Sequence, residues 1–143
     1  AVHRFMGRIS GPRMDRIDLH GVVTPVTPAE LSRAEPGEPS AAIRERVVRA
    51  REVQQRRFRG VEGVHTNAMM NAAMLREYCR PDAAGAALLE RAMERLSLSA
   101  RAYDRILKVA RTIADLAGRE RITAQEIAEA VGYRSLDRGN WGE

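Results

Sequence analysis

The sequence predicts a mainly α-helical bundle, and three observations carry this prediction. Apolar residues make up 44% of the 143 residues, which is enough for one folded domain with its own core. Aromatic residues make up only 4%, so this core must consist of Ala, Leu, Ile, Val and Met side chains. Beyond residue 40, apolar residues recur at helical spacing between recognisable helix start and stop signals.

The clearest element is a helix over residues 99–118, and we expect the other helices to pack around it. Ser99 can cap its N-terminus, and Gly118 suits the left-handed residue that ends a helix. The side expected to face the core carries Ala102, Tyr103, Ile106, Val109, Ala110, Ile113, Leu116 and Ala117. The opposite, polar side carries Arg101, Arg105, Lys108, Thr112 and Asp115.

The first 40 residues predict little regular structure. Ser10 and Pro12 indicate the start of a short helix. Residues 17–23 alternate apolar and polar side chains, which predicts the one convincing strand of the chain. Because a single strand is not stable alone, we interpret the chain as a fragment cut away from neighbouring strands, with residues 1–24 poorly anchored. Four prolines and a glycine in residues 24–40 predict a linker, with a helical turn near residues 28–32.

A long basic helix is predicted over residues 40–58, with Ser40 as its cap and Gly60 as its stop. Residues 40–59 hold seven arginines and two glutamates, so their net charge of +5 equals that of the whole chain. Such a helix suits a nucleic-acid backbone, and the residues that would contact phosphates are Arg44, Arg49, Arg51 and Arg56. An ordinary solvated helix face explains the same pattern, and base-stacking aromatic residues are nearly absent.

Three shorter helices complete the predicted bundle. Asn71 and Asp82 are positioned to cap two of them. The last helix begins at a capping box formed by Thr123 and Glu126 and ends at Gly132. Residues 134–143 are polar and contain glycine, which predicts a flexible tail.

No complete active site is visible in the sequence. There is no glycine-rich phosphate loop, the His and Cys residues lack metal-ligand spacing, and no serine has a partnered histidine. We therefore expect no metal site, and no ATPase activity from the isolated chain. The single cysteine, Cys79, indicates a reducing compartment, and no apolar run approaches the roughly 20 residues that span a membrane.

One arginine breaks a local rule. Arg101 falls in the first turn of the helix over residues 99–118, where the helix dipole makes a cation mildly unfavourable. An arginine beside free backbone N–H groups is half of an anion site, and phosphate is the common anion. The alternative is an ordinary solvated arginine.

Three stretches resemble a known family: GRISGPRMDRIDLH at residues 7–20, LSLSARAYDRILKVARTIADL at residues 96–116, and ITAQEIAEAV at residues 122–131. Together they resemble the C-terminal part of the magnesium-chelatase-like AAA+ ATPases, in the competence-associated branch usually described as magnesium-chelatase-related protein. The resemblance implies the end of an ATPase core at residues 1–24, a linker at 25–39, a helical lid at 40–133 and a tail at 134–143.

The resemblance also implies roles for two arginines. Arg101 matches the sensor-2 arginine, which reaches the ATP phosphates of its own subunit. Arg16 matches the arginine finger, which acts on the ATP of the neighbouring subunit. From the residues alone, a local salt bridge from Arg16 to Asp15 or Asp18 is an equal alternative.

For the parent protein, the resemblance implies a cytoplasmic ring oligomer, a hexamer by analogy, that uses ATP with Mg²⁺ to remodel DNA. Most contacts to ATP and Mg²⁺ would come from parts outside this chain. Two alternatives remain open at this point. The chain could be a helical nucleic-acid-binding module acting through its basic helix, or a helical interaction domain without either activity.

Overall fold

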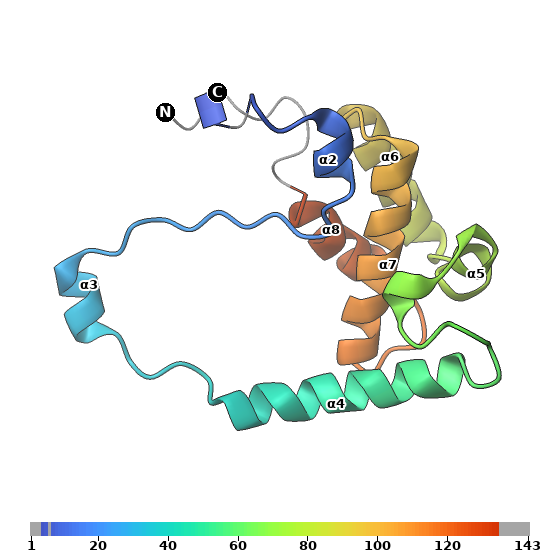
Figure 1. Cartoon of the computed structure of the whole chain (residues 1–143), viewed down its shortest axis with the longest axis horizontal. Coiled ribbons are helices and arrows are strands. Elements are labelled where there is room, and N and C mark those ends of the chain that lie inside the picture. The colour runs from blue at the N-terminus through green and yellow to red at the C-terminus, as the bar shows by residue number, and fades with distance from the viewer. Residues whose placement is uncertain (1–3, 6, 135–143) are drawn as a thin grey trace.

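The computed structural model of the chain describes residues 4–5 and 7–134, and it confirms a mainly α-helical fold (Figure 1). The elements described are α2 (Gly11–Asp15), α3 (Pro28–Arg33), α4 (Ser40–Arg57), the 3₁₀ turn η1 (Asn67–Met69), α5 (Ala72–Tyr78), α6 (Ala83–Arg95), α7 (Ala100–Leu116) and α8 (Ala124–Gly132). No helix in this part of the chain combines the length and the apolar character needed to cross a membrane.

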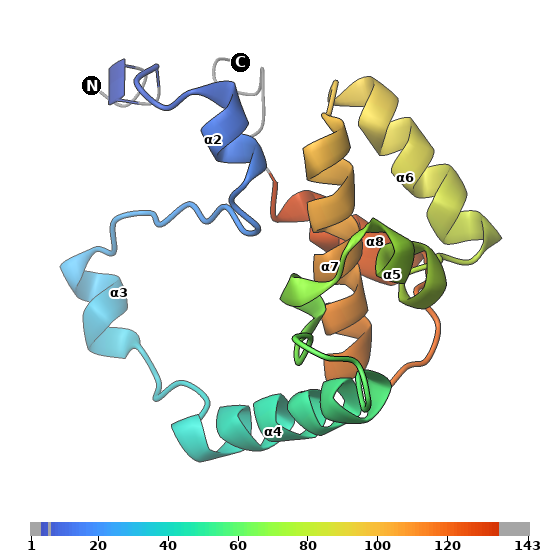
Figure 2. The same cartoon turned by 45° about the vertical axis from the view of Figure 1, so that its right-hand side comes forward.

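Helix α7 is the centre of the molecule, as predicted. Helices α8, α5 and α4 and the turn η1 all pack against it, and α6 packs against α8. Figure 2 shows α4 crossing α7 near its C-terminal end, while α2 lies beside its N-terminal end. The core consists of Phe58, Met70, Leu75, Cys79, Leu89, Ile106, Leu107, Ala110, Ala114, Ile122, Ile127 and Ala130.

The predicted inner face of α7 is only partly right. Leu107 and Asp115, which we had not placed toward the core, are buried, whereas Tyr103 and Leu116 are exposed. Helices contact α7 from several directions, so its buried surface is wider than one apolar stripe. A buried carboxylate in such a helix needs partners from elsewhere in the chain.

The capping predictions hold for four helices. The side chains of Asn71, Asp82, Ser99 and Thr123 each accept a hydrogen bond from a backbone N–H of the first turn. The prediction for Ser40 is wrong, because the cap of α4 is Pro39 and no side chain completes it.

Gly118 and Gly85 serve the bundle for two different reasons. Gly118 follows α7 with a φ of 69°, as its predicted role in ending the helix requires. Gly85 lies where α6 approaches the loop before α8, and a Cβ there would meet the Thr123 carbonyl carbon at 3.2 Å. Gly85 thus allows α6 and α8 to pack closely.

The predicted strand over residues 17–23 does not form. Within the described residues there is no β-strand, and the one isolated bridge joins Pro81 to Ile122. Residues 17–23 have no regular secondary structure, with a bend at Asp18, and no neighbouring strand pairs with them in the described part of the chain. Leu19, Val22 and Val23 are accordingly exposed.

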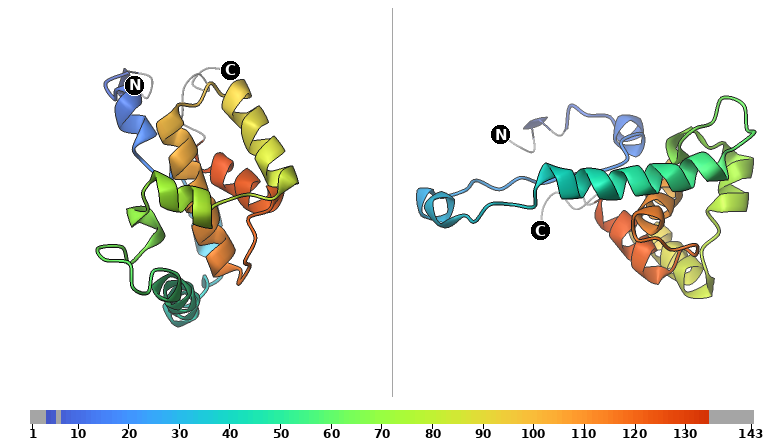
Figure 3. Two further views of the ribbon diagram at one scale, coloured as in Figure 1. Left: turned by 90° about the vertical axis from the view of Figure 1, so that its right-hand side faces the viewer. Right: turned by 90° about the horizontal axis from the view of Figure 1, so that it is seen from below.

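Residues 21–39 form an arm that extends away from the bundle and returns to it at α4 (Figure 3). Every residue of this arm is exposed. Helix α3 lies within it, which confirms the predicted helical turn, and Thr27 and Glu30 form a capping box at its start. Since α3 buries no residue, local capping rather than packing holds it.

The segment before the arm is anchored, contrary to our expectation for residues 1–24. Arg134 is only 2% exposed, and its guanidinium donates to the carbonyl oxygens of Ile17 at 2.7 Å, Met14 at 3.3 Å and Asp15 at 3.4 Å. The backbone N–H of His20 also donates to the backbone carbonyl of Tyr133 at 2.6 Å. Arg134 is therefore not the start of a flexible tail, and residues 135–143 of that predicted tail lie outside the described residues.

A buried polar network joins α4 to α7. The Asp115 carboxylate, with 0% side-chain exposure, accepts two hydrogen bonds from Arg57, at 2.6 and 2.8 Å. Asn67 donates to the same carboxylate at 2.8 Å, and Arg111 Nε lies 3.3 Å from it. Arg111 also donates to the carbonyls of Arg119 and Glu120, both at 2.8 Å. This network therefore attaches α4, η1 and the α7–α8 loop to one carboxylate.

We predict that Asp115→Asn lowers the free energy of unfolding by about 3 kcal/mol, because it leaves two guanidinium groups around a neutral side chain. Urea unfolding followed by far-ultraviolet circular dichroism measures the change. Glu45→Gln is the matched control, since Glu45 pairs with Arg49 at side-chain exposures of 69% and 63% and should contribute almost nothing. Equal unfolding curves for the two variants would contradict the prediction.

We also predict that Arg134→Ala frees the segment around α2 from the bundle. Hydrogen exchange of the His20 amide should become about tenfold faster or more, because hydrogen bonds from a charged group contribute about 1.5–3 kcal/mol. Amides in the middle of α7 serve as the internal control and should keep their rates. An unchanged rate at His20 would show that other contacts hold the segment.

Candidate functional site

Arg101 lies in the first turn of α7, and its side chain is exposed. The Ser99 hydroxyl caps this turn by accepting from the Ala102 N–H at 3.2 Å. Among the described residues, no hydrogen-bond or ion-pair partner engages the Arg101 guanidinium. A cation at the positive end of a helix dipole with no carboxylate beside it is free to bind an anion.

Arg16 directly follows α2 as its C-cap residue, and it is also exposed. The local salt bridge that we considered as its alternative role does not form in the described part of the chain. Asp18 instead lies 3.2 Å from Arg105 of α7, and Asp15 is buried. The Arg16 guanidinium therefore extends from an anchored turn, and none of the residues that the structure describes pairs with it.

The structure brings these two arginines to the same end of the molecule. Helix α2 packs on α7 near its N-terminus, as Figures 1 and 2 show. The ion pair between Asp18 and Arg105 joins the residues just after Arg16 to the turn of α7 that follows Arg101. The sequence did not predict this ion pair, because its two members are far apart in the chain and each resembles an ordinary surface charge.

The basic helix lies at the opposite end of α7, and fewer of its arginines are available than we expected. Arg46 is bound to Glu38, Arg49 to Glu45, and Arg57 to Asp115. The arginines of α4 with no partner among the described residues are Arg44, Arg51 and Arg56. Of the four residues predicted to contact nucleic acid, Arg49 alone is therefore already in an ion pair, and that pair is exposed.

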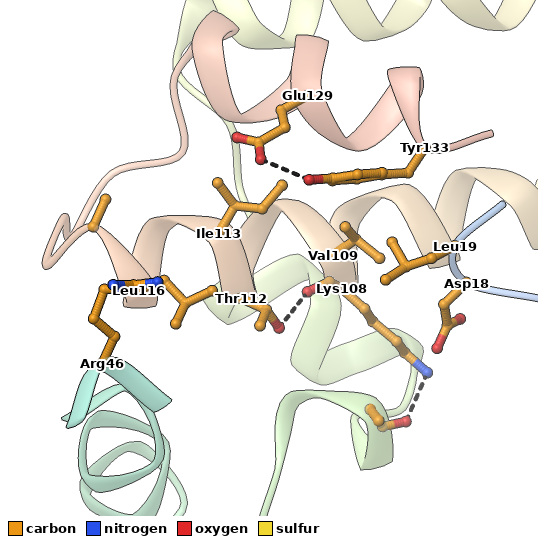
Figure 4. Close-up of a pocket in the computed structure, with 12 residues that line it drawn as sticks. Asp18, Leu19, Arg46, Lys108, Val109, Thr112, Ile113, Leu116, Glu129 and Tyr133 are labelled. Atoms are coloured by element: carbon orange, nitrogen blue, oxygen red, sulfur yellow. Dashed lines mark hydrogen bonds between the residues drawn. The ribbon is translucent and has the colours of Figure 1, made fainter. Parts of the chain in front are cut away.

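A groove of about 570 Å³ lies between α7, α8 and the start of α4 (Figure 4). Val109, Ile113 and Leu116 give it an apolar floor. Its polar groups are largely engaged, since Lys108 donates to the Ala68 carbonyl at 3.1 Å and the Tyr133 hydroxyl donates to Glu129 at 3.0 Å. The groove thus lacks the free titratable groups that a catalytic centre requires.

The lone cysteine is a core residue. Cys79 is 0% exposed, and burial raises the pKa of its thiol to about 11, so it stays protonated at neutral pH and is not a nucleophile. The described residues also contain no group of three or more His, Cys, Asp and Glu side chains that could hold a metal ion.

Comparison with known proteins shows what this chain is similar to. The family described as magnesium chelatase, subunit ChlI C-terminal, matches residues 37–134. Competence protein ComM of Haemophilus influenzae is 40% identical over 139 residues, which are 96% of this chain and 26% of ComM. The uncharacterized protein YifB of Escherichia coli is 41% identical over 136 residues, 94% of this chain and 26% of YifB.

A mycobacterial relative matches similar shares of this chain and of its own length. An uncharacterized protein of Mycobacterium tuberculosis is 39% identical over 131 residues, 92% of this chain and 26% of that protein. The chain thus spans about a quarter of the length of these relatives. Because the family match covers most of the helical bundle and the relatives match nearly the whole chain, the resemblance seen in the sequence is confirmed. The chain belongs to the magnesium-chelatase-related family and contains its C-terminal domain.

Proposed function

We propose that the chain is the lid region of a magnesium-chelatase-like AAA+ ATPase and that Arg101 acts as its sensor-2 residue. The observation that carries the proposal is the unpartnered guanidinium of Arg101 at the N-terminus of the central helix. The remaining polar groups that α7 buries, such as Asp115 and Arg111, are bound within the chain. In this proposal, residues 1–24 end the ATPase core, residues 25–39 link it to the lid, and residues 40–133 are the lid.

ATP with Mg²⁺ is the proposed cofactor, and the free guanidinium of Arg101 suits its negative phosphates. Bound ATP supplies the phosphoryl group, and Mg²⁺ neutralises part of its charge. Arg101 would hold the phosphates by charge-assisted hydrogen bonds. The described residues offer neither a phosphate loop nor a carboxylate cluster, so the cradle and the magnesium ligands would come from the rest of the longer protein.

Arg16 is the proposed arginine finger, acting in trans. Its exposed side chain and the lack of a local salt bridge leave it free to reach a neighbouring subunit. This role requires a ring, for which a hexamer is our proposal. The name of competence protein ComM supports DNA as the substrate that the ring remodels. The proposed location is the cytoplasm, whose reducing conditions suit a chain with a single cysteine.

A nucleic-acid-binding module is the second candidate, supported by the free side chains of Arg44, Arg51 and Arg56 along α4. Binding of DNA by the isolated chain with a steep dependence on salt would favour this candidate. The ion pairs of Arg46, Arg49 and Arg57 reduce the charge available for it, so we rank it below the ATPase lid.

For Arg101→Ala in the full-length protein, we predict an ATP affinity or ATPase rate that is roughly 10- to 100-fold lower, as expected for losing a charge-assisted hydrogen bond. The unfolding temperature should not change, because Arg101 is exposed and has no side-chain partner among the described residues. Arg95→Ala, in an exposed position at the end of α6, is the matched control and should behave as the wild type. Full activity in Arg101→Ala would refute the sensor role.

For Arg16→Ala, we predict an inactive ring whose subunits still bind nucleotide, because a finger in trans contributes about 10³–10⁵ in rate but little to the subunit's own site. Mixing this variant with a subunit that has an inactive phosphate loop should restore part of the ATPase activity. In such mixed rings, the intact phosphate loop of an Arg16→Ala subunit can lie beside the intact Arg16 of its neighbour. If every mixture is equally inactive, Arg16 has a structural role instead.

A further inference from the structure

We propose that Arg134 is the positioning residue for Arg16 and joins it to the helical domain as one rigid body. The inference rests on the proposed role of Arg16 in trans. It adds a residue that lies 118 positions further along the chain and carries no motif of its own.

Arg134 holds the backbone on both sides of Arg16. Its guanidinium donates to the carbonyls of Met14 and Asp15, which precede Arg16, and to the carbonyl of Ile17, which follows it. Met14 and Asp15 lie at the C-terminal end of α2, where the helix dipole favours a cation. The Met14 carbonyl also accepts from the backbone N–H of Ile17 at 3.1 Å, so Arg134 adds to the hydrogen bonds of this turn. The planar fork of a guanidinium can serve several carbonyls at once, which a lysine cannot do in the same way.

Helix α2 needs this support. It has five residues, too few for a helix that is stable on its own, and its N-cap residue makes no side-chain hydrogen bond. Its last residue, Asp15, is the only one of the five that is buried. The turn that carries Arg16 is therefore fixed mainly from outside, by the buried side chain of Arg134 just after α8.

Two further contacts attach the same turn to the bundle. Asp18 lies 3.2 Å from Arg105, which is on α7 one turn after Arg101, and the His20 N–H donates to the Tyr133 carbonyl at 2.6 Å. The proposed finger and the proposed sensor are thus held by the same pair of packed helices, α7 and α8. A movement of these helices caused by nucleotide at Arg101 would carry Arg16 with it into the neighbouring site.

This arrangement matters for catalysis because a catalytic group must be positioned accurately relative to the reacting atoms. A displacement of about 1 Å in such a group can cost on the order of 100-fold in rate. If Arg134 positions Arg16, its removal should therefore have the same consequences as removal of Arg16. If Arg134 only stabilises the fold, its removal should affect every function of the subunit together.

The test uses Arg134→Ala in the full-length protein, with ATPase assays on mixed rings and binding of a fluorescent ATP analogue. We expect about 100-fold lower ATPase activity for the variant alone, with its nucleotide affinity retained. Mixing with a subunit that has an inactive phosphate loop should restore partial activity. Mixing with Arg16→Ala should restore none, because neither subunit then supplies a working finger.

Arg105→Ala is the second variant, because it weakens the same attachment at a position with 32% side-chain exposure and so is expected to fold. It should show the same mixing pattern with a smaller loss. Arg134→Lys, which keeps the charge but not the fork, should recover only part of the activity. If Arg134→Ala fails to fold, the mixing pattern of Arg105→Ala decides the question.

Several results would overturn the inference. They are wild-type activity of Arg134→Ala, restored activity when it is mixed with Arg16→Ala, or loss of nucleotide binding in parallel with activity. For Arg105→Ala, restored activity with Arg16→Ala would do the same. Failure of the proposed function is seen separately, since Arg16→Ala would then be active by itself.

Discussion

The bundle depends on the carboxylate of Asp115. It receives Arg57 from α4 and Asn67 from η1, and Arg111 from its own helix lies beside it. Burial lowers the pKa of the Arg111 guanidinium, and the charge of Asp115 opposes that change. Because buried charges are tolerated only when they are paired and hydrogen-bonded, this network permits one main arrangement of α4 against α7. Such a constraint favours specificity of the fold more than its stability.

Arginines perform different tasks at the two ends of α7. At the C-terminal end, the buried Arg111 and the half-buried Arg57 hold helices together. At the N-terminal end, Arg134 is buried for the same purpose, while Arg16 and Arg101 stay exposed and unpaired within the described part of the chain. The hydrogen bonds and ion pairs of Arg57, Arg111 and Arg134 fix the helices and turns that carry Arg16 and Arg101. Net charge alone does not distinguish the two groups, since each guanidinium carries the same charge.

The arm at residues 21–39 and the segment at residues 17–23 differ from the bundle, because packing against other helices does not determine their conformation. Residues 17–23 have the alternation of a strand but no strand to pair with, and α3 keeps its shape by its own capping box. The chain spans about a quarter of the length of the relatives that it matches. Exposed Val22 and Val23 are consistent with an element that is complete only beside a further surface.

The sequence by itself determined the helical class, the order of the helices and most of their ends. These features depend on local rules: side chains such as Ser99 and Thr123 cap the backbone within three residues, and Gly118 adopts a conformation that others avoid. The sequence also indicated Arg16 and Arg101, because both lie in recognisable motifs. Only the tertiary structure decided that Arg57 binds Asp115, that Asp115 faces the core and that Arg134 bonds to the backbone on both sides of Arg16. Each of these outcomes depends on a partner that is distant in the chain, and local periodicity carries no information about where such a partner lies.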